Sequence, residues 1–253
     1  MFVENSEKNR VLILQFMSKL EILAIIPARG GSKGIPGKNI KHLNSKPLLA
    51  YTALSAMNSK FITRRVLSTD DTEIAKIGAE YGLEVPFMRP SHLASDLSPS
   101  LEAFQFTLKE LAARAGYIPD LVVILQPTSP LRNSTHIDEA IEQYIGADAD
   151  SLVSIVKIPH HMTPFSAMQK NIDGYLHSLT NLNELQNQRQ NKPIYFARNG
   201  AAIYITNPRN LVNNNSLFGK KIIGYEMSKL DSIDIDDEED WALAEALLQW
   251  KTK

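Results

Sequence analysis

The chain has 253 residues, of which 43% are hydrophobic and 22% are charged, so it can build a sizeable core and lacks the composition typical of disorder. Its 27 basic and 28 acidic residues give a net charge of −1, which argues against nucleic acid as the main partner because no overall positive field attracts a polyanion. The lack of cysteine excludes disulfides, cysteine-based zinc sites and thiol catalysis.

The beginning of the chain shows no recognisable targeting signal. The apolar run over residues 11–17 is interrupted by Gln15 and is shorter than the roughly 20 apolar residues of a membrane span. It also lacks the basic start and the small-residue cleavage site of a secretory signal. We therefore expect a cytoplasmic protein with no membrane partner. We expect residues 1–20 to form an N-terminal extension, of which residues 1–16 are dispensable.

From Glu21 onward, short apolar runs alternate with amphipathic stretches. We predict strands over residues 22–26, 65–68, 121–125, 152–156 and 202–206. The predicted helices cover residues 47–60, 72–81, 100–115, 135–145 and 238–250. Strands separated by helices in this rhythm predict one α/β domain over residues 21–253, with a doubly wound, mostly parallel sheet covered on both faces.

Residues 157–198 break this rhythm. The segment is polar, rich in Asn and Gln, and has no clear period, so we expect it to leave the sheet. One interpretation is a long surface loop. The other is an arm that packs on a second subunit, because unperiodic insertions of this length are usually functional.

A glycine-rich, basic loop follows the first predicted strand, where residues 28–39 read ARGGSKGIPGKN. Its glycines are Gly30, Gly31, Gly34 and Gly37, and its cations are Arg29, Lys33 and Lys38. Glycines let backbone N–H groups approach an anion closely, and the spacing matches neither a Walker A loop nor a dinucleotide-binding fingerprint. Between residues 21 and 46, five basic residues oppose one acidic residue, a local charge of +4. The loop predicts a polyphosphate site at a strand's carboxyl end; the alternative is a flexible basic surface loop.

An acidic motif lies near the C terminus, where residues 232–240 read SIDIDDEED. In an extended segment, Asp234 and Asp236 point to one side while Ile233 and Ile235 point to the other, into a core. Two carboxylates on one side suit Mg²⁺, which also takes phosphate oxygens and water. The alternative is that the run is only the acidic beginning of the last helix, where the helix dipole favours negative charge.

Six motifs in order carry a resemblance to a known family. They are IPARGGSKGIPGKN (residues 26–39), STD (68–70), RPSHLASD (89–96), LQPTSPLR (125–132), RNG (198–200) and DSIDID (231–236). With these motifs the chain resembles the acylneuraminate cytidylyltransferases, which comprise CMP-sialic acid synthetases and their relatives for legionaminic and pseudaminic acids. The resemblance extends from about residue 23 to the C terminus.

The resemblance implies a Rossmann-like nucleotidyltransferase fold with an inserted dimerisation arm at residues 157–198, forming a homodimer or a dimer of dimers. It implies that CMP from CTP is joined to the C2 hydroxyl of a nonulosonic (nine-carbon 2-keto acid) sugar, with release of pyrophosphate. Such activated sugars serve the synthesis of cell-surface polysaccharides. The cofactor implied is Mg²⁺, or Mn²⁺ in its place.

Site residues are carried over from the resemblance by position. Those implied at the nucleotide are Arg29, Gly30, Gly31, Ser32, Lys33, Lys38, Asn39, Arg89, Ser98 and Ser100. Of these, Arg29 and Lys38 are the implied catalytic residues. The sugar side is implied to consist of Gln126, Arg189 and Asn199, and the metal ligands are implied to be Asp234 and Asp236.

The chemistry of this reaction agrees with the residue types. A sugar hydroxyl must attack the α-phosphorus in line while negative charge builds on oxygen, so positioning and charge neutralisation supply most of the catalysis. No side chain in the motifs is an obvious covalent nucleophile. Two alternatives remain at this stage: a nucleotidyltransferase for another sugar or a sugar phosphate, and a catalytically silent nucleotide-binding regulator.

Overall fold

The computed structural model describes residue 17 and residues 19–32, 34–95, 98–179, 193–200 and 202–251. Residues 1–16, Lys33 and Arg189, which the sequence analysis singled out, lie outside the described residues. Within the described part of the chain, no helix is long and apolar enough to span a membrane.

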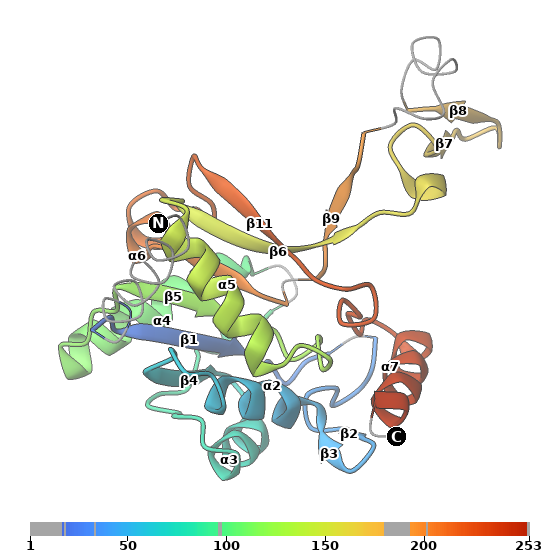
Figure 1. The fold of residues 1–253 in the computed structure, drawn as a ribbon. Coiled ribbons are helices and arrows are strands. Elements are labelled where there is room, and N and C mark those ends of the chain that lie inside the picture. Colours follow the sequence, from blue (N-terminus) through green and yellow to red (C-terminus); the bar gives the residue numbers. More distant parts are fainter. Residues whose placement is uncertain are drawn as a thin grey trace.

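One central sheet organises the fold (Figure 1). Its strands are β1 (Ile22–Pro27), β4 (Arg64–Ser68), β5 (Leu121–Ile124), β6 (Ser151–Lys157), β9 (Phe196–Arg198), β10 (Tyr204–Thr206) and β11 (Ile222–Glu226). They lie in the order β11-β6-β10-β5-β1-β4, with β9 paired to β6. Neighbours are parallel except at β10, which runs antiparallel to β5 and β6, and at β9, which runs antiparallel to β6. The predicted mostly parallel α/β sheet is confirmed, with β10 and β9 as its antiparallel members.

Helices cover both faces of this sheet, because alternate residues of each central strand are buried on opposite sides. One face packs on α2 (Leu48–Met57), α3 (Thr72–Glu80) and α5 (Ser134–Gly146), through a core that includes Ile22, Ala24 and Ile26 of β1. The other face packs on α4 (Ser100–Ala115) and α6 (Pro208–Val212), where Leu23 and Ile25 of β1 are buried. The doubly wound arrangement follows from this alternation.

A third, smaller core holds the C-terminal helix against the glycine loop. Helix α7 (Glu238–Lys251) contributes Trp241 and Ala244, while Ile35 of the loop and Ile235 of the acidic motif are buried beside them. The short hairpin of β2 (His42–Leu43) and β3 (Lys46–Pro47) borders this core, to which Leu43 belongs. The glycine loop and the acidic motif are therefore packed on a common set of apolar side chains.

The observed elements match most predictions, and two of the differences have local reasons. Strand β11 was not predicted, because it is partly exposed and carries Gly224 in its middle. The strand predicted to begin at Ala202 begins at Tyr204. Between β9 and β10 the chain leaves the ladder opposite Ser154, whose Oγ accepts a hydrogen bond from the Ile203 backbone N at 2.9 Å. The described residues of this interruption, 199–200 and 202–203, lie outside the ladder, and we call them the bulge.

The described residues of the segment predicted to leave the sheet do so as an arm, defined here as residues 158–179 and 193–195. It carries the turn of 3-10 helix η2 (His160–Met162) and the hairpin of β7 (Met168–Lys170) and β8 (Leu176–Ser178). Figure 1 shows this arm projecting away from the body beyond β6 and β9. The end of the predicted excursion is corrected, because Phe196–Arg198 rejoins the sheet as β9. Pairing of the arm with a second subunit stays a prediction.

The part of the predicted N-terminal extension that the structure describes is packed on the body. Met17 is buried in the core that includes β1 and α2, and Leu20 packs against the same core. The Leu20 backbone N donates to the Met17 carbonyl at 3.1 Å. Packing on the body thus includes Met17 and Leu20, while the division of the chain after residue 20 and the dispensability of residues 1–16 stay predictions.

Candidate active site

The predicted site residues gather at one edge of the central sheet. Strands β1, β4 and β5 are parallel and end there side by side, so the loops that follow them meet. These loops are the glycine loop, the segment Ser68–Asp70 and the segment Gln126–Thr128. Because β10 runs in the opposite direction, its beginning faces the same edge and brings the bulge before it to this edge.

The glycine loop is held over this edge by its backbone. The Gly30 N donates to Asp70 Oδ1 at 3.1 Å. A side chain at Gly30 would place its Cβ 2.7 Å from Asp71 Oδ2 and 3.1 Å from Asp71 Cβ, so the glycine leaves room for the Asp71 side chain. The buried Asn39 donates from Nδ2 to the Arg29 carbonyl at 3.0 Å, which closes the loop on itself. The predicted contact of Asn39 with the nucleotide stays a prediction.

The glycine loop also packs directly on the acidic motif. Lys38 donates from Nζ to the Ile235 carbonyl at 2.7 Å, across 197 residues of sequence. A Cβ on Gly34 would lie 2.2 Å from the Asp236 carbonyl oxygen, so the two backbones touch at this point. The Ile235 N in turn donates to the Thr128 carbonyl at 2.9 Å. The loops after β1 and β5 and the acidic motif therefore form one connected structure.

Asp234 is the most unusual carboxylate of this edge. Its Oδ1 is buried and has no hydrogen-bond partner among the described residues. Burial raises the pKa of Asp234 to about 6; a hydrogen bond from Thr128 and the charge of Lys38 act against this rise, whereas the Asp236 carboxylate adds to it. Ile233 and Ile235 pack in the third core, as the alternation predicted. A buried, unpartnered carboxylate oxygen beside a second carboxylate is an arrangement that a cation would stabilise.

The donor set fits a hard divalent cation bound together with a ligand. In the described part of the chain, no cluster of three or more His, Cys, Asp or Glu side chains could hold a metal by protein atoms alone. Mg²⁺ is usually bound by one or two carboxylates, and its other ligands are water and phosphate oxygens. Asp234 and Asp236 supply such a pair, and Lys38 and the glycine loop beside Asp236 are suited to phosphates.

The bulge before β10 brings Gly200 against Asp234. Gly200 has a φ of +67°, a conformation that favours glycine. A Cβ at this position would lie 1.9 Å from Asp234 Oδ2. In the sequence this glycine belongs to the RNG motif, which by itself indicates no role for it. The structure shows that its missing side chain makes room for the predicted metal ligand.

Two adjoining hollows open at this edge. The first is lined by Arg29, Arg89, Ser98, Ser100 and Gln126, among others. The second is lined by Arg29, Ser32, Lys38, Asn39, Gln126, Thr128 and Asp236, among others. Arg29 and Gln126 line both hollows. The two hollows thus share a wall, and one elongated ligand can occupy both.

Arg89 supplies a buried positive charge to the first hollow. Its Nη2 donates to the Ser68 carbonyl at 2.6 Å, and its Nε has no hydrogen-bond partner among the described residues. Burial lowers the pKa of Arg89, although the nearby Asp70 acts in the opposite direction. On the other wall, Ser98 donates from Oγ to the His92 carbonyl at 2.5 Å. A guanidinium and hydroxyl groups around a small hollow suit a polar, anionic ligand.

Gln126 is positioned by a residue to which the sequence analysis gave no role. Arg132 is fully buried, and its Nη1 donates to the carbonyls of Gln126 and Ala202 at 3.1 and 2.8 Å. Its Nη2 donates to Thr52 Oγ1 at 2.5 Å, and burial lowers its pKa to about 9. Arg132 thus ties the loop after β5 to the bulge before β10. The only signal in the sequence was its place at the end of the LQPTSPLR motif.

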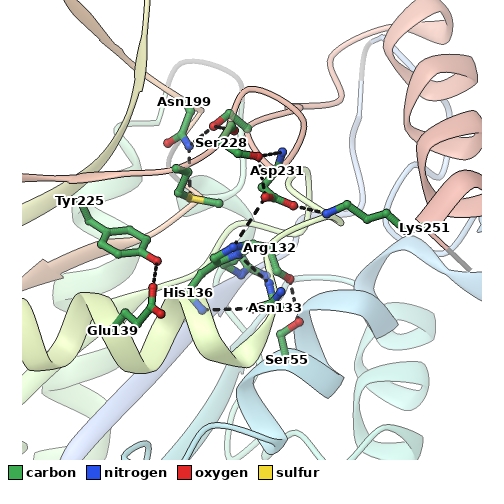
Figure 2. Close-up of polar contacts among 12 residues, drawn as sticks. Ser55, Arg132, Asn133, His136, Glu139, Asn199, Tyr225, Ser228, Asp231 and Lys251 are labelled. Atoms are coloured by element: carbon green, nitrogen blue, oxygen red, sulfur yellow. Dashed lines mark hydrogen bonds and ion pairs between the residues drawn. The ribbon is translucent and has the colours of Figure 1, made fainter.

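The predicted sugar-side residues are not brought together as a set. Gln126 lines both hollows, whereas Arg189, like Lys33 on the nucleotide side, lies outside the described residues. Asn199, labelled in Figure 2, is buried; its Nδ2 donates to Ser232 Oγ at 2.9 Å and to the sulfur of Met227 at 3.3 Å. Its amide is thus engaged within the protein, and its contact with a sugar stays a prediction.

Comparison with known proteins decides the family. The family model described as cytidylyltransferase matches residues 23–252. The chain belongs to the cytidylyltransferase family. This cytidylyltransferase is 33% identical over 231 residues to the CMP-N,N'-diacetyllegionaminic acid synthase of Legionella pneumophila, covering 91% of this chain and 97% of that protein.

A second relative is a longer protein than this chain. The N-acylneuraminate cytidylyltransferase of Escherichia coli O18:K1:H7 is 34% identical over 237 residues, which cover 93% of this chain but 54% of that protein. The cytidylyltransferase described here thus spans about half of that relative. Among solved structures, CMP:2-keto-3-deoxy-manno-octonic acid synthetase in complex with CTP has a TM-score of 0.68 at 16% identity, covering 91% of this chain and 99% of that chain. This likeness confirms the Rossmann-like nucleotidyltransferase fold.

Proposed function

We propose that this cytidylyltransferase joins CMP from CTP to the C2 hydroxyl of a nonulosonic sugar and releases pyrophosphate. The observation that carries the proposal is the meeting of the glycine loop, Lys38 and the Asp234–Asp236 carboxylates beside two hollows with a common wall. This is the arrangement that a nucleoside triphosphate with a divalent cation requires. The names of the relatives from Legionella and Escherichia indicate sugars of the nonulosonic class.

The two hollows divide the nucleotide between them in this proposal. Arg89, Ser98 and Ser100 contact the cytidine in the first hollow. Residues 29–32, together with Lys38 and Asn39, bind the triphosphate in the second hollow, and Lys33, which lies outside the described residues, is proposed to contact it as well. The acceptor sugar lies next to Gln126, with Arg189 and Asn199 on its side. Location in the cytoplasm stays a prediction from the sequence.

The cation in this proposal is Mg²⁺, with Mn²⁺ as a substitute, and Asp234 and Asp236 hold it. When bound, the cation neutralises charge on the phosphates and lowers the barrier to attack at the α-phosphorus. Lys38 and Arg29 are the catalytic residues because their fixed positive charges stabilise the negative charge that builds on the phosphate oxygens. Lys38 is oriented for this role by its hydrogen bond to the Ile235 carbonyl. The sugar hydroxyl attacks directly, and pyrophosphate leaves in line.

The arm is proposed to pair two copies of the chain, as a homodimer or within a dimer of dimers. Of 17 exposed large hydrophobic side chains among the described residues, eight lie between residues 157 and 198. They are Met162, Met168, Ile172, Tyr175, Leu176, Leu179, Ile194 and Phe196. Such a concentration of exposed apolar groups on a projecting segment supports a protein partner, and a second copy also explains why the segment stands away from its own body.

A panel of purified substrates tests the proposed function. The protein is incubated with each of the four nucleoside triphosphates, with Mg²⁺ and with sialic, legionaminic or pseudaminic acid or a sugar phosphate, and pyrophosphate release is measured. We expect release only with CTP and a nonulosonic acid. Release with a sugar phosphate, or with another nucleotide, contradicts the proposal, and so does binding of CTP without turnover, as in a silent regulator.

A further inference from the structure

A carboxylate outside the proposed site lies three residues before the first proposed metal ligand. Asp231 accepts a hydrogen bond from Lys251 Nζ through Oδ1 and one from Ser228 Oγ through Oδ2, the latter at 2.6 Å. His136 Nε2 lies 3.7 Å from the same Oδ2. Figure 2 shows Asp231 between Lys251 of the last turn of α7 and His136 of the first turn of α5. One carboxylate therefore joins two helices to the loop that leads to the acidic motif.

The loop itself is closed by hydrogen bonds around Asp231. The Asp231 backbone N donates to Ser228 Oγ at 3.1 Å, and Ser232 Oγ donates to the Ser228 carbonyl at 2.7 Å. Ser232 Oγ also accepts from Asn199 Nδ2 at 2.9 Å, which attaches the loop to the bulge that contains Gly200. The side chain of Asp231 is 15% exposed, so its contacts are shielded from water.

The charges of these groups are set by their surroundings. Burial raises the pKa of Asp231, but the hydrogen bonds from Lys251 and Ser228 outweigh it and hold that pKa below its usual value. His136 Nδ1 accepts a hydrogen bond from the Asn133 backbone N, and burial lowers the pKa of His136. A neutral His136 therefore carries its hydrogen on Nε2, toward Asp231. Asp231 stays ionised and acts only as an acceptor.

The anchors of Asp231 lie on one side of Asp234, and a second set lies on the other. After Asp234, the Ile235 N is bonded to the Thr128 carbonyl and the Ile235 carbonyl to Lys38 Nζ. Asp234 thus lies between two fixed points of the backbone. Its own Oδ1 has no partner among the described residues, so apart from the hydrogen bond from Thr128 the direction of the Asp234 carboxylate depends on these backbone anchors.

We propose that Asp231 is a positioning residue for the metal site: with Lys251 it fixes the backbone that presents Asp234 to a divalent cation. The inference rests on the proposed function in that Asp234 and Asp236 are the ligands. It also means that the last turn of α7, far from the hollows in sequence, contributes to metal affinity. Groups that hold metal-ligating side chains in place commonly change metal affinity by about 10- to 100-fold when they are replaced.

The test measures Mn²⁺ binding to the complex of the protein with CTP, without sugar, because the two carboxylates are expected to share the cation with phosphate oxygens. The readout is the loss of the electron paramagnetic resonance signal of free Mn²⁺ relative to CTP alone. We expect Asp231→Asn to raise the Kd for Mn²⁺ about tenfold. CTP binding in the absence of divalent metal should not change. Lys251→Met should weaken Mn²⁺ binding in the same direction, and Lys251→Arg should restore it, because an arginine keeps the charge and the donors.

Glu84→Gln is the matched control. Glu84 accepts hydrogen bonds from Arg64 Nε and Nη2 at 3.0 and 2.8 Å, so this variant removes a comparable ion pair at β4, outside the proposed site. It should bind Mn²⁺ as the wild type does. If Asp231→Asn does not fold, the two Lys251 variants decide, because Lys251 is a partly exposed residue of the last turn.

Two results overturn the inference: unchanged Mn²⁺ affinity in folded Asp231→Asn and Lys251→Met, even with a lowered melting temperature, or no Mn²⁺ binding by the wild type. Failure of the proposed function is distinguishable from both. In that case the wild type binds Mn²⁺ but transfers CMP to no acceptor, and the comparison of Mn²⁺ affinities still decides the role of Asp231.

Discussion

The carboxyl edge of the sheet and the arm place their polar and apolar groups in opposite ways. At the edge, charged groups such as Arg89 and Asp234 are largely buried, and atoms of both have no partner in the described part of the chain. In the arm, the apolar side chains are on the outside, and residues such as Ile172 and Tyr175 are exposed. In our proposal, small charged ligands complete the edge, whereas a protein surface completes the arm.

The largest expected effect of a substitution is at the metal ligands. Asp234→Asn and Asp236→Asn should each lower kcat by about 10²- to 10³-fold, because the charge on the transferring phosphate is then poorly neutralised. Steady-state kinetics with saturating CTP measures this. Asp148→Asn is the matched control, since Asp148 is an exposed carboxylate paired with Lys221. Near-normal turnover of both Asn variants would remove the metal assignment from the edge.

Gly200→Ala sharpens the claim that the edge depends on close backbone approach. The new Cβ would collide with Asp234 Oδ2, and the positive φ is unfavourable for alanine. We expect kcat to fall about tenfold or more, with weaker Mn²⁺ binding, in line with the cost of displacing a catalytic group. Gly146→Ala is the control, because a Cβ there meets no atom within 4 Å. Equal behaviour of the two variants would show that Gly200 does not control the position of Asp234.

The arm should govern association without governing nucleotide binding. Met168→Glu combined with Leu176→Glu places charge on its exposed apolar surface and should convert dimers to monomers in sedimentation velocity at micromolar concentration. Val212→Glu, at an equally exposed apolar side chain of the body, should leave the mass unchanged. The monomeric variant should still bind CTP with wild-type affinity. A wild type that is strictly monomeric contradicts the pairing, and loss of CTP binding contradicts the division between the regions.

The smallest expected effect is on stability, and it comes from the pKa of Asp234. The folded protein holds a proton on Asp234 up to about pH 6, whereas the ordinary value is 3.8. Without metal, the free energy of unfolding contributed by this group therefore falls as the pH rises from 3.8 to 6. An asparagine at this position cannot ionise, so the Asp234→Asn variant does not lose this free energy of unfolding. It should therefore melt a few degrees higher than the wild type at pH 7, with no difference near pH 4. Scanning calorimetry in chelator measures it, and a variant that melts lower at pH 7 would contradict the buried, unpartnered state.

Short-range sequence patterns, such as apolar runs and helix-ending glycines, correctly predicted the fully buried strands and the helices that pack on them. Strand β5 is apolar throughout and buried, and α4 ends at Gly116 as its sequence indicates. The sequence predicted that the glycine loop and the acidic motif act together, because a phosphate loop and a pair of carboxylates suit a triphosphate with a metal ion. The hydrogen bond from Lys38 to the Ile235 carbonyl, by contrast, depends on packing across the whole chain. The role of Gly200 and the contacts of Asp231 were not predictable for the same reason, since the bulge and the helix ends that create them are set by long-range pairing.

The most direct test of the proposed reaction follows the oxygen atom of the sugar C2 hydroxyl into the product. The acceptor sugar selected by the substrate panel is equilibrated in ¹⁸O-labelled water so that its C2 hydroxyl carries the label, and it is then reacted with CTP, Mg²⁺ and excess protein. If the sugar hydroxyl attacks the α-phosphorus, ³¹P nuclear magnetic resonance will show ¹⁸O at the phosphorus of the CMP-sugar and none in pyrophosphate. Label in pyrophosphate, or a CMP-sugar without label at phosphorus, would contradict the proposed reaction.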